Sequence, residues 1–356
     1  MSSSVAASDA ASPRADAPAW RQALAPYSRP RIARSVLDVA TSAVPYVALS
    51  VLMYLSLSVS YLLTLALAIP TSGFLVRTFI VFHDCTHGSF LPSKRANAWL
   101  GATLGLLVFA TFGCWRHNHA VHHATVGDLN RRGIGDVQTI TVAEYQTLSW
   151  PSRLAYRLFR HPLVMFGLGP IYVLVVQPRL VPRSARPRIK RGIIATDLAL
   201  VAFVGGLCWL VGWRDYLLVQ GTTLMLGGAA GIWLFYVQHQ FEDVYWESGD
   251  GWSYADAALR GSSYLKLPKV LQFFSGNIGL HHVHHLNARI PNYNLQRAHD
   301  DNEIFHAVPT LSLTDGLRAV RFKLYDEQGR RMVSFAQARR LSGAGRDRSR
   351  LAVPPG

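Results

Sequence analysis

Long apolar runs constrain this chain more than any other feature of its sequence. A helix that crosses the hydrocarbon core of a bilayer, roughly 30 Å thick, needs about 20 apolar residues. Residues 39–82 are apolar almost throughout, which is enough for two crossings, and residues 192–213 and 216–237 are each long enough for one. Two further runs, 98–113 and 163–176, are too short to span. We therefore expect an integral membrane protein with four spanning helices.

The composition agrees with a membrane protein. Half of the 356 residues are hydrophobic and only 16% are charged, against about 25% in a typical soluble domain. A formal charge of +15 is also found in proteins that bind nucleic acid. Here, however, the basic residues lie between and outside the apolar runs, where they suit loops that face anionic lipid. We therefore expect a lipid bilayer as partner and no nucleic acid.

Eight histidines occur in three clusters that have the spacing of one helical face. His83 and His87 are four positions apart, which places both rings on the same side of a helix. The other two clusters share the pattern H-x-x-H-H and comprise His119, His122, His123, His281, His284 and His285. A ninth histidine, His239, follows the last long apolar run.

These clusters indicate a metal site and not core packing. Histidine is a poor core residue, and neighbouring rings repel one another when protonated. A metal ion instead binds several neutral rings at once. Eight or nine rings exceed the coordination number of one ion, so we expect two ions to share them. His239 alone would be weak evidence for a metal, and it is a candidate ligand because of the other eight.

The clusters also constrain the topology. A single metal site requires all of them to lie on one side of the membrane, so the runs 98–113 and 163–176 must dip into the bilayer and return, or lie in its interface. Both chain ends and the basic stretch 183–191 then fall on the same side, which by the positive-inside rule is the cytoplasm. We expect an all-α membrane fold with four spanning helices, two non-spanning apolar segments and a cytoplasmic helical cap.

Composition divides the chain into three parts. Residues 1–34 are rich in Ala, Ser, Pro and Arg, and we expect a disordered basic tail there and not a signal peptide. Residues 35–325 form the expected membrane domain. Residues 326–356 are expected to be a polar, basic C-terminal tail.

The motifs HDCTHGSF, WRHNHAVHHATVGDLNRRGIGD and GLHHVHHLNARIPNYNL resemble the three histidine boxes of the membrane fatty-acid desaturase family. The likeness runs from about residue 35 to about residue 325 and is closest to bacterial acyl-lipid desaturases of the omega-6 type. It implies two iron ions held by the eight box histidines, and molecular oxygen as co-substrate. It also implies electrons from a ferredoxin or a b-type cytochrome, and a role for His239 as the extra ligand that some relatives supply.

The resemblance implies an oxidoreductase that introduces a double bond into an acyl chain carried by a membrane lipid or an acyl thioester. It places the protein in a bacterial inner (plasma) membrane, with its active site facing the cytoplasm. Related di-iron hydroxylases or ketolases that act on carotenoids, alkanes or sphingolipids share the boxes and are an alternative. A metal transporter is a weaker alternative, because it would place polar ligands near the middle of its spanning segments.

Histidines that bind metal usually donate their second N–H to a carboxylate or a carbonyl. Polar residues close to the clusters in sequence are candidates for this outer shell. They are Asp84, Asn118, Asp128, Asp136, Glu242, Asp243 and Asn277.

Overall fold

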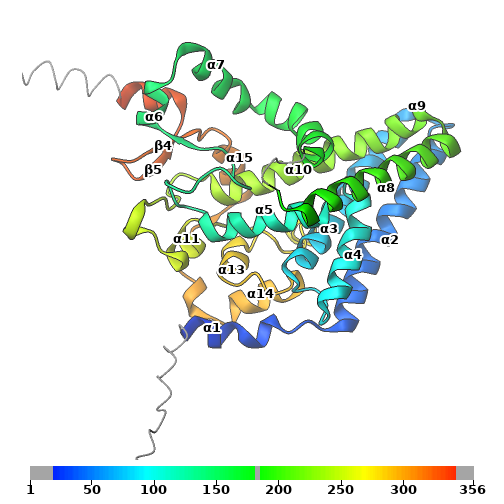
Figure 1. Ribbon diagram of the computed structural model, residues 1–356, viewed down its shortest axis with the longest axis horizontal. Helices are drawn as coiled ribbons and strands as arrows, with labels where there is room; N and C mark the ends of the chain where they lie inside the picture. The colour runs from blue at the N-terminus through cyan, green and yellow to red at the C-terminus, as the bar shows by residue number, and fades with distance from the viewer. Residues whose placement is uncertain (1–18, 181–184, 342–356) are drawn as a thin grey trace, which may run out of the picture.

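The structure is a computed structural model that describes residues 19–180 and 185–341. Four of its helical segments are long and apolar enough to cross a membrane, as predicted, and they lie together in one half of the molecule (Figure 1). They are α2 (Ile32–Ser56), α3 (Tyr61–His87), α8 (Pro187–Val211) and the segment Trp213–His239, which ends in α10 (Thr222–His239).

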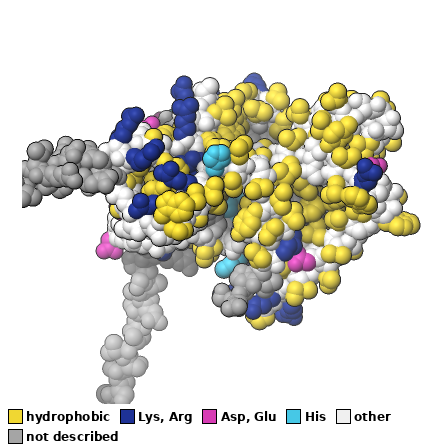
Figure 2. Space-filling view, turned by 90° about the horizontal axis from the view of Figure 1, so that it is seen from above, with side chains coloured by type: hydrophobic (Ala, Val, Ile, Leu, Met, Phe, Trp, Pro, Cys, Tyr) yellow, Lys and Arg dark blue, Asp and Glu magenta, His cyan; other side chains and the backbone are white. Residues whose placement is uncertain are grey.

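The outer faces of these helices are suited to lipid. Only 11% of the apolar stretch of α8 is buried, and large side chains such as Val201 and Trp209 are exposed on it. Figure 2 shows hydrophobic side chains over the long helices, whereas Lys and Arg gather over the other end of the molecule. Exposed apolar surface of this extent is unfavourable in water, at about 25 cal/mol per Å². The four apolar helices therefore mark a membrane protein.

Two bent helix pairs occupy the positions of the shorter apolar runs. Helix α4 (Lys94–Leu107) meets α5 (Phe112–Thr125) at 103°, and α7 (Trp150–Phe159) meets the segment Val164–Arg179 at 60°. At the first bend Phe109 has a φ of 57°, in the left-handed region. Bends of this size fit segments that enter the membrane and return, so they agree with the predicted non-spanning segments.

Helix α3 is the central element of the fold. It packs against α2, α4, α5 and α10, and against two short helices, α12 (Lys269–Phe274) and α14 (Asn292–Asp300). The helix ends where Gly88 adopts a φ of 67°, a conformation that glycine reaches without steric cost. His83 and His87 therefore lie in its last two turns, at the boundary between the long helices and the cap.

The cap consists of short helices and two small sheets. The helices include α6 (Val142–Thr147), α11 (Tyr254–Arg260), α13 (His281–Leu286) and α15 (Leu313–Ala319). In one sheet β4 (Leu324–Asp326) lies between β1 (Ile140–Thr141) and β5 (Arg331–Val333), and in the other β2 (Tyr264–Leu265) pairs with β3 (Thr310–Leu311). The helical fold class is confirmed, and the strands are additions too short for sequence alternation to predict.

The folded part of the chain extends beyond residues 35–325. Within the predicted N-terminal tail lie α1 (Ala19–Leu24) and a turn of 3₁₀ helix, Ala25–Ser28, and Leu24 is fully buried against the cap. Within the predicted C-terminal tail, Met332 and Val333 are fully buried. These short segments have too few apolar residues to predict a fold on their own, and tertiary contacts order them. Residues 1–18, 181–184 and 342–356 lie outside the described residues.

A buried arginine joins the cap to the last spanning helix. Arg160, at the end of α7, is fully buried and donates hydrogen bonds to Gln138 O (2.6 Å), Tyr236 Oη (3.0 Å) and Gln240 Oε1 (2.7 Å). Gln240 directly follows His239, so this network fixes the end of α10 that carries the ninth histidine.

Arg160→Met is predicted to lower the free energy of unfolding by about 3 kcal/mol, because Gln138 O, Tyr236 Oη and the buried Gln240 Oε1 each lose a charged hydrogen-bond donor. Thermal unfolding of the purified protein in detergent measures the change.

Lys323→Met is the matched control, because Lys323 lies beside the same network. Its Nζ is 3.5 Å from Tyr236 Oη, and burial, together with Arg160, lowers the pKa of Lys323 to about 7. Removing this poorly solvated amine is expected to leave the unfolding temperature unchanged or to raise it. Equal losses from both substitutions would contradict a specific role for the Arg160 hydrogen bonds.

Candidate metal centre

The histidines of the site come from four helices that meet at one end of the membrane-spanning half. The last two turns of α3 carry the first pair, α5 and α13 carry three ring positions each, and His239 is the last residue of α10. In α5 and α13 the spacing of three and four positions puts the rings on one face, as the sequence predicts. The structure brings all nine candidate ligands together in two groups.

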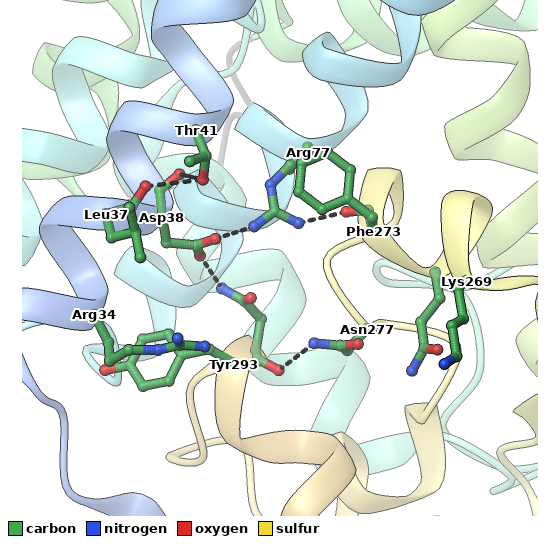
Figure 3. A pocket seen from close by; sticks show the side chains of 11 residues that line it. Arg34, Leu37, Asp38, Thr41, Arg77, Lys269, Phe273, Asn277 and Tyr293 are labelled. Carbon is green, nitrogen blue, oxygen red and sulfur yellow. Dashed lines mark hydrogen bonds and ion pairs between the residues drawn. The ribbon is translucent and has the colours of Figure 1, made fainter.

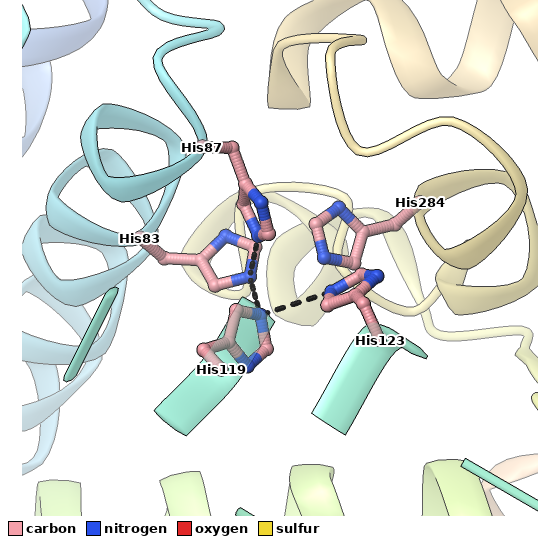
Figure 4. Close-up of side chains that lie close together, drawn as sticks. All are labelled: His83, His87, His119, His123 and His284. Atoms are coloured by element: carbon pink, nitrogen blue, oxygen red, sulfur yellow. Dashed lines mark hydrogen bonds between the residues drawn. The ribbon is translucent and has the colours of Figure 1, made fainter. Parts of the chain in front are cut away.

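The first group contains five rings from three helices, and Figure 4 shows them pointing toward one another. One nitrogen of each ring lies within 4.8 Å of the others in the set His83, His87, His119, His123 and His284. Within it, the Nε2 atom of His119 lies 2.9 Å from that of His83 and 3.1 Å from that of His123.

The second group contains four rings, again with nitrogens within 4.8 Å of one another: His122, His239, His281 and His285. The Nε2 atom of His239 lies 3.2 Å from that of His122 and 2.9 Å from that of His281. The two groups touch, because the rings of His123 and His285 stack at 4.1 Å with an angle of 14°. Two ions bound in these groups would be neighbours.

Burial keeps the rings in the form that binds metal. Eight of the nine are at most 8% exposed, and His87 is half-buried. For five rings on α5 and α13, burial and then the neighbouring rings lower the pKa well below its usual value; they are His119, His123, His281, His284 and His285. These rings are therefore neutral near pH 7, and each offers a nitrogen lone pair.

The hydrogen bonding of the rings fits a metal. A neutral imidazole has one donor and one acceptor nitrogen, yet the Nε2 atom of His119 faces two other Nε2 atoms. Neither nitrogen of His284 has a hydrogen-bond partner among the described residues, although the ring is 1% exposed. A cation at the centre of each group would satisfy these nitrogens. Rings alone suit iron, zinc, copper or nickel.

Three of the rings have a polar partner at Nδ1, the nitrogen that faces away from the centre of each group. His83 Nδ1 lies 3.3 Å from Asp84 Oδ1, His122 Nδ1 is hydrogen-bonded to Asp136, and His239 Nδ1 donates to the Gly261 carbonyl at 3.0 Å. Donation from Nδ1 leaves the lone pair on Nε2, the atom that faces the centre of each group. Asp84 and Asp136 thus contact candidate ligand rings, as an outer-shell role would require.

The other five outer-shell candidates lie elsewhere. Among the described residues, no hydrogen bond to a histidine ring is made by Asn118, Asp128, Glu242, Asp243 or Asn277. Asp128 pairs with Arg131, and the Glu242 carboxylate faces Arg331 at 3.8 Å. Closeness in sequence does not decide where a loop side chain points, and the geometry does not support these five assignments.

Two groups that orient the site were not found from the sequence. Asn292 donates to Asp84 Oδ2 from its backbone N–H (2.7 Å) and from its side chain (3.0 Å), which holds Asp84 against His83. Asn292 lies in the third histidine motif, GLHHVHHLNARIPNYNL, and its place in that motif is the signal that could have suggested a role at the site. The Gly261 carbonyl lies 22 positions from its partner His239 and gives no signal in the sequence.

Asp136→Ala is predicted to lower the affinity for metal by roughly 10–100-fold, because His122 loses the carboxylate that fixes its ring. The metal content of the purified protein, measured after dialysis against a graded series of chelator concentrations, reports the change.

Glu242→Ala removes the same charge from a residue that touches no ring, and it should retain metal as the unaltered protein does. Equal metal loss in both variants would contradict the role of Asp136.

Comparison with known proteins identifies the family. The profile of the family described as fatty acid desaturase matches residues 57–311. A fatty acid desaturase of Bacillus subtilis is 45% identical over 312 residues, covering 88% of this chain and 89% of that protein. An sn-1 acyl-lipid omega-3 desaturase (ferredoxin) of Synechocystis is 30% identical over 235 residues, 62% of each chain. An sn-1 oleoyl-lipid 12-desaturase of Synechocystis is 26% identical over 243 residues, 64% of this chain and 65% of that protein. This chain therefore belongs to the fatty acid desaturase family, and it is an oxidoreductase that desaturates acyl chains.

Proposed function

We propose that the two histidine groups hold two iron ions, and that the protein uses them with molecular oxygen to desaturate an acyl chain of a membrane lipid. The observation that carries the proposal is the pair of adjacent groups, of five and four rings, in which every ligand is an imidazole. They lie at the ends of α3 and α10, beside the lipid-facing half of the molecule.

The reaction favours iron among the metals that imidazole suits. An acyl –CH₂–CH₂– becomes –CH=CH–, and the two hydrogens leave with O₂, two external electrons and two protons as two molecules of water. Zinc has no redox chemistry and cannot take part in such a step. Iron ions bound in the two groups would supply the oxidising chemistry that removes hydrogen from an unactivated methylene.

The protein's own residues supply position and a dry environment. Asp84 and Asp136 orient two of the rings, and aromatic side chains pack on others. Trp115 lies over His119 with ring centroids 4.2 Å apart, and Phe235 lies 5.2 Å from His122. This packing holds the rings in one geometry and keeps bulk water from the centre.

A separate electron donor of the ferredoxin type is part of the proposal. One relative is named as a ferredoxin-dependent acyl-lipid desaturase, and Lys and Arg gather over the cap end of the molecule (Figure 2). A basic surface attracts an acidic donor protein. A b-type cytochrome is the second candidate, since the same surface would attract any acidic carrier.

We place the site on the cytoplasmic side of a bacterial inner membrane. The basic residues Arg186, Arg188 and Arg191 lie at the start of α8, on the side of the histidines if α8 and α10 both span. Cytoplasmic loops of membrane proteins carry such an excess of Lys and Arg. The Bacillus subtilis relative supports a bacterial setting.

Gas chromatography of total fatty acids from a host that expresses the chain tests the proposal. We expect an additional unsaturated fatty acid with the unaltered chain and none with His122→Ala, whose ring belongs to the second group. His306→Ala is the matched control, because His306 is exposed and belongs to neither group.

A hydroxylated or keto product would instead assign the chain to the related hydroxylases or ketolases, which share the first hydrogen removal. Full desaturation by His122→Ala would contradict its role as a ligand.

A further inference from the structure

A second polar site lies apart from the histidines, in a cavity of about 410 Å³ between α2, α3, α12 and α14. Figure 3 shows the side chains that converge on it from these elements. Its size is within the range of cavities that hold small molecules, about 300–1,000 Å³. The charged residues that line it are Arg34, Asp38, Arg77 and Lys269.

The cavity has an excess of positive charge. Its acid, Asp38, is already engaged, because it pairs with Arg77 and accepts a hydrogen bond from the Asn292 side chain at 2.7 Å. Among the described residues, Arg34 and Lys269 have no hydrogen bond or ion pair from their side chains. The Arg34 guanidinium lies 5.9 Å from the centre of the Tyr293 ring. Two cations that have no ion-pair partner among the described residues therefore line a cavity whose only carboxylate is already paired with Arg77.

The surroundings of the cavity are those of a membrane boundary. Arg34 and Asp38 lie in the first two turns of α2, where Ile32 and Val36 are 61% and 60% exposed. On the opposite wall, Lys269 begins α12, and the next residue, Val270, is 67% exposed. Cationic side chains beside exposed aliphatic ones, near the end of a spanning helix, are found where lipid headgroups lie.

We propose that this cavity binds the phosphate of the phospholipid whose acyl chain is desaturated, with Arg34 and Lys269 as the groups that contact it. A guanidinium binds phosphate oxygens in a fork and an ammonium binds them as a point charge, so the pair suits a phosphodiester. The cavity is concave and small, which favours a headgroup over the surface of a partner protein. The inference rests on the proposed function, since it names the carrier of the acyl chain.

The cavity is also connected to the metal centre. The Asn292 side chain forms part of the cavity wall, donates to Asp38, and donates to Asp84 at 3.0 Å. Asp84 in turn lies 3.3 Å from the ring of His83. A headgroup bound here would thus be held a few side chains from the histidine groups, on the α2 side of α3.

The test compares lipid binding by the full chain and by R34Q/K269Q in a neutral detergent. Dissociation constants are measured for dioleoyl phosphatidylglycerol, for dioleoylglycerol, which has the same acyl chains and no phosphate, and for inorganic phosphate. The double substitution should weaken binding of the phospholipid about tenfold or more and leave dioleoylglycerol unchanged. R318Q/R321Q removes the same charge from exposed residues outside the cavity and should bind all three as the unaltered chain does.

Phospholipid binding that is unaffected in R34Q/K269Q, or weakened equally in R318Q/R321Q, would overturn the site. If inorganic phosphate binds as tightly as the phospholipid, the phosphate recognised by the cavity is not that of a lipid headgroup. These assays require neither metal nor turnover, so they separate the two claims. If the unaltered chain binds the phospholipid but produces no new fatty acid, the result counts against the proposed function. If it produces the new fatty acid but R34Q/K269Q binds the phospholipid normally, the result counts against the cavity.

Discussion

Nine closely packed imidazoles with facing nitrogens, eight of them buried, are the constraint on which the rest of the structure depends. Rings packed this closely cannot all be protonated, and as neutral groups they leave nitrogens such as those of His284 without a hydrogen-bond partner in the part of the chain that the structure describes. Metal ions bound in the two groups would convert that cost into binding energy. The ends of α3, α5, α10 and α13 must then meet at one place, and the two bent helix pairs follow, because they keep every cluster on the same side of the membrane.

A chain of polar contacts ties this centre to the membrane-spanning half. It runs from His83 through Asp84 and Asn292 to Asp38 on α2. On the other side Arg160 connects the cap to Gln240, next to His239. Each link satisfies a buried polar group that would otherwise be costly. The same contacts that stabilise the fold thus fix the orientation of the rings.

The spanning helices and the histidine faces could be predicted from the sequence. The residues that hydrogen-bond to the histidine rings could for the most part not be. Spans follow from hydropathy, and the ring faces follow from helical spacing, because both are local properties of the chain. Asn292 and Gly261 orient rings through contacts set only by tertiary packing. For the same reason Asp84 and Asp136 reach a ring whereas Asp128 and Glu242 turn to arginines. The burial of Leu24 and Met332 also depends on neighbours distant in the chain.

The most direct test of the central claim is the metal content of the purified full-length protein, combined with X-ray absorption at the metal edge. Two adjacent groups made only of imidazole predict two iron ions for each chain, with nitrogen from histidine as the protein ligand of both. A single ion for each chain, zinc in place of iron, or sulfur among the ligands would contradict this account of the site.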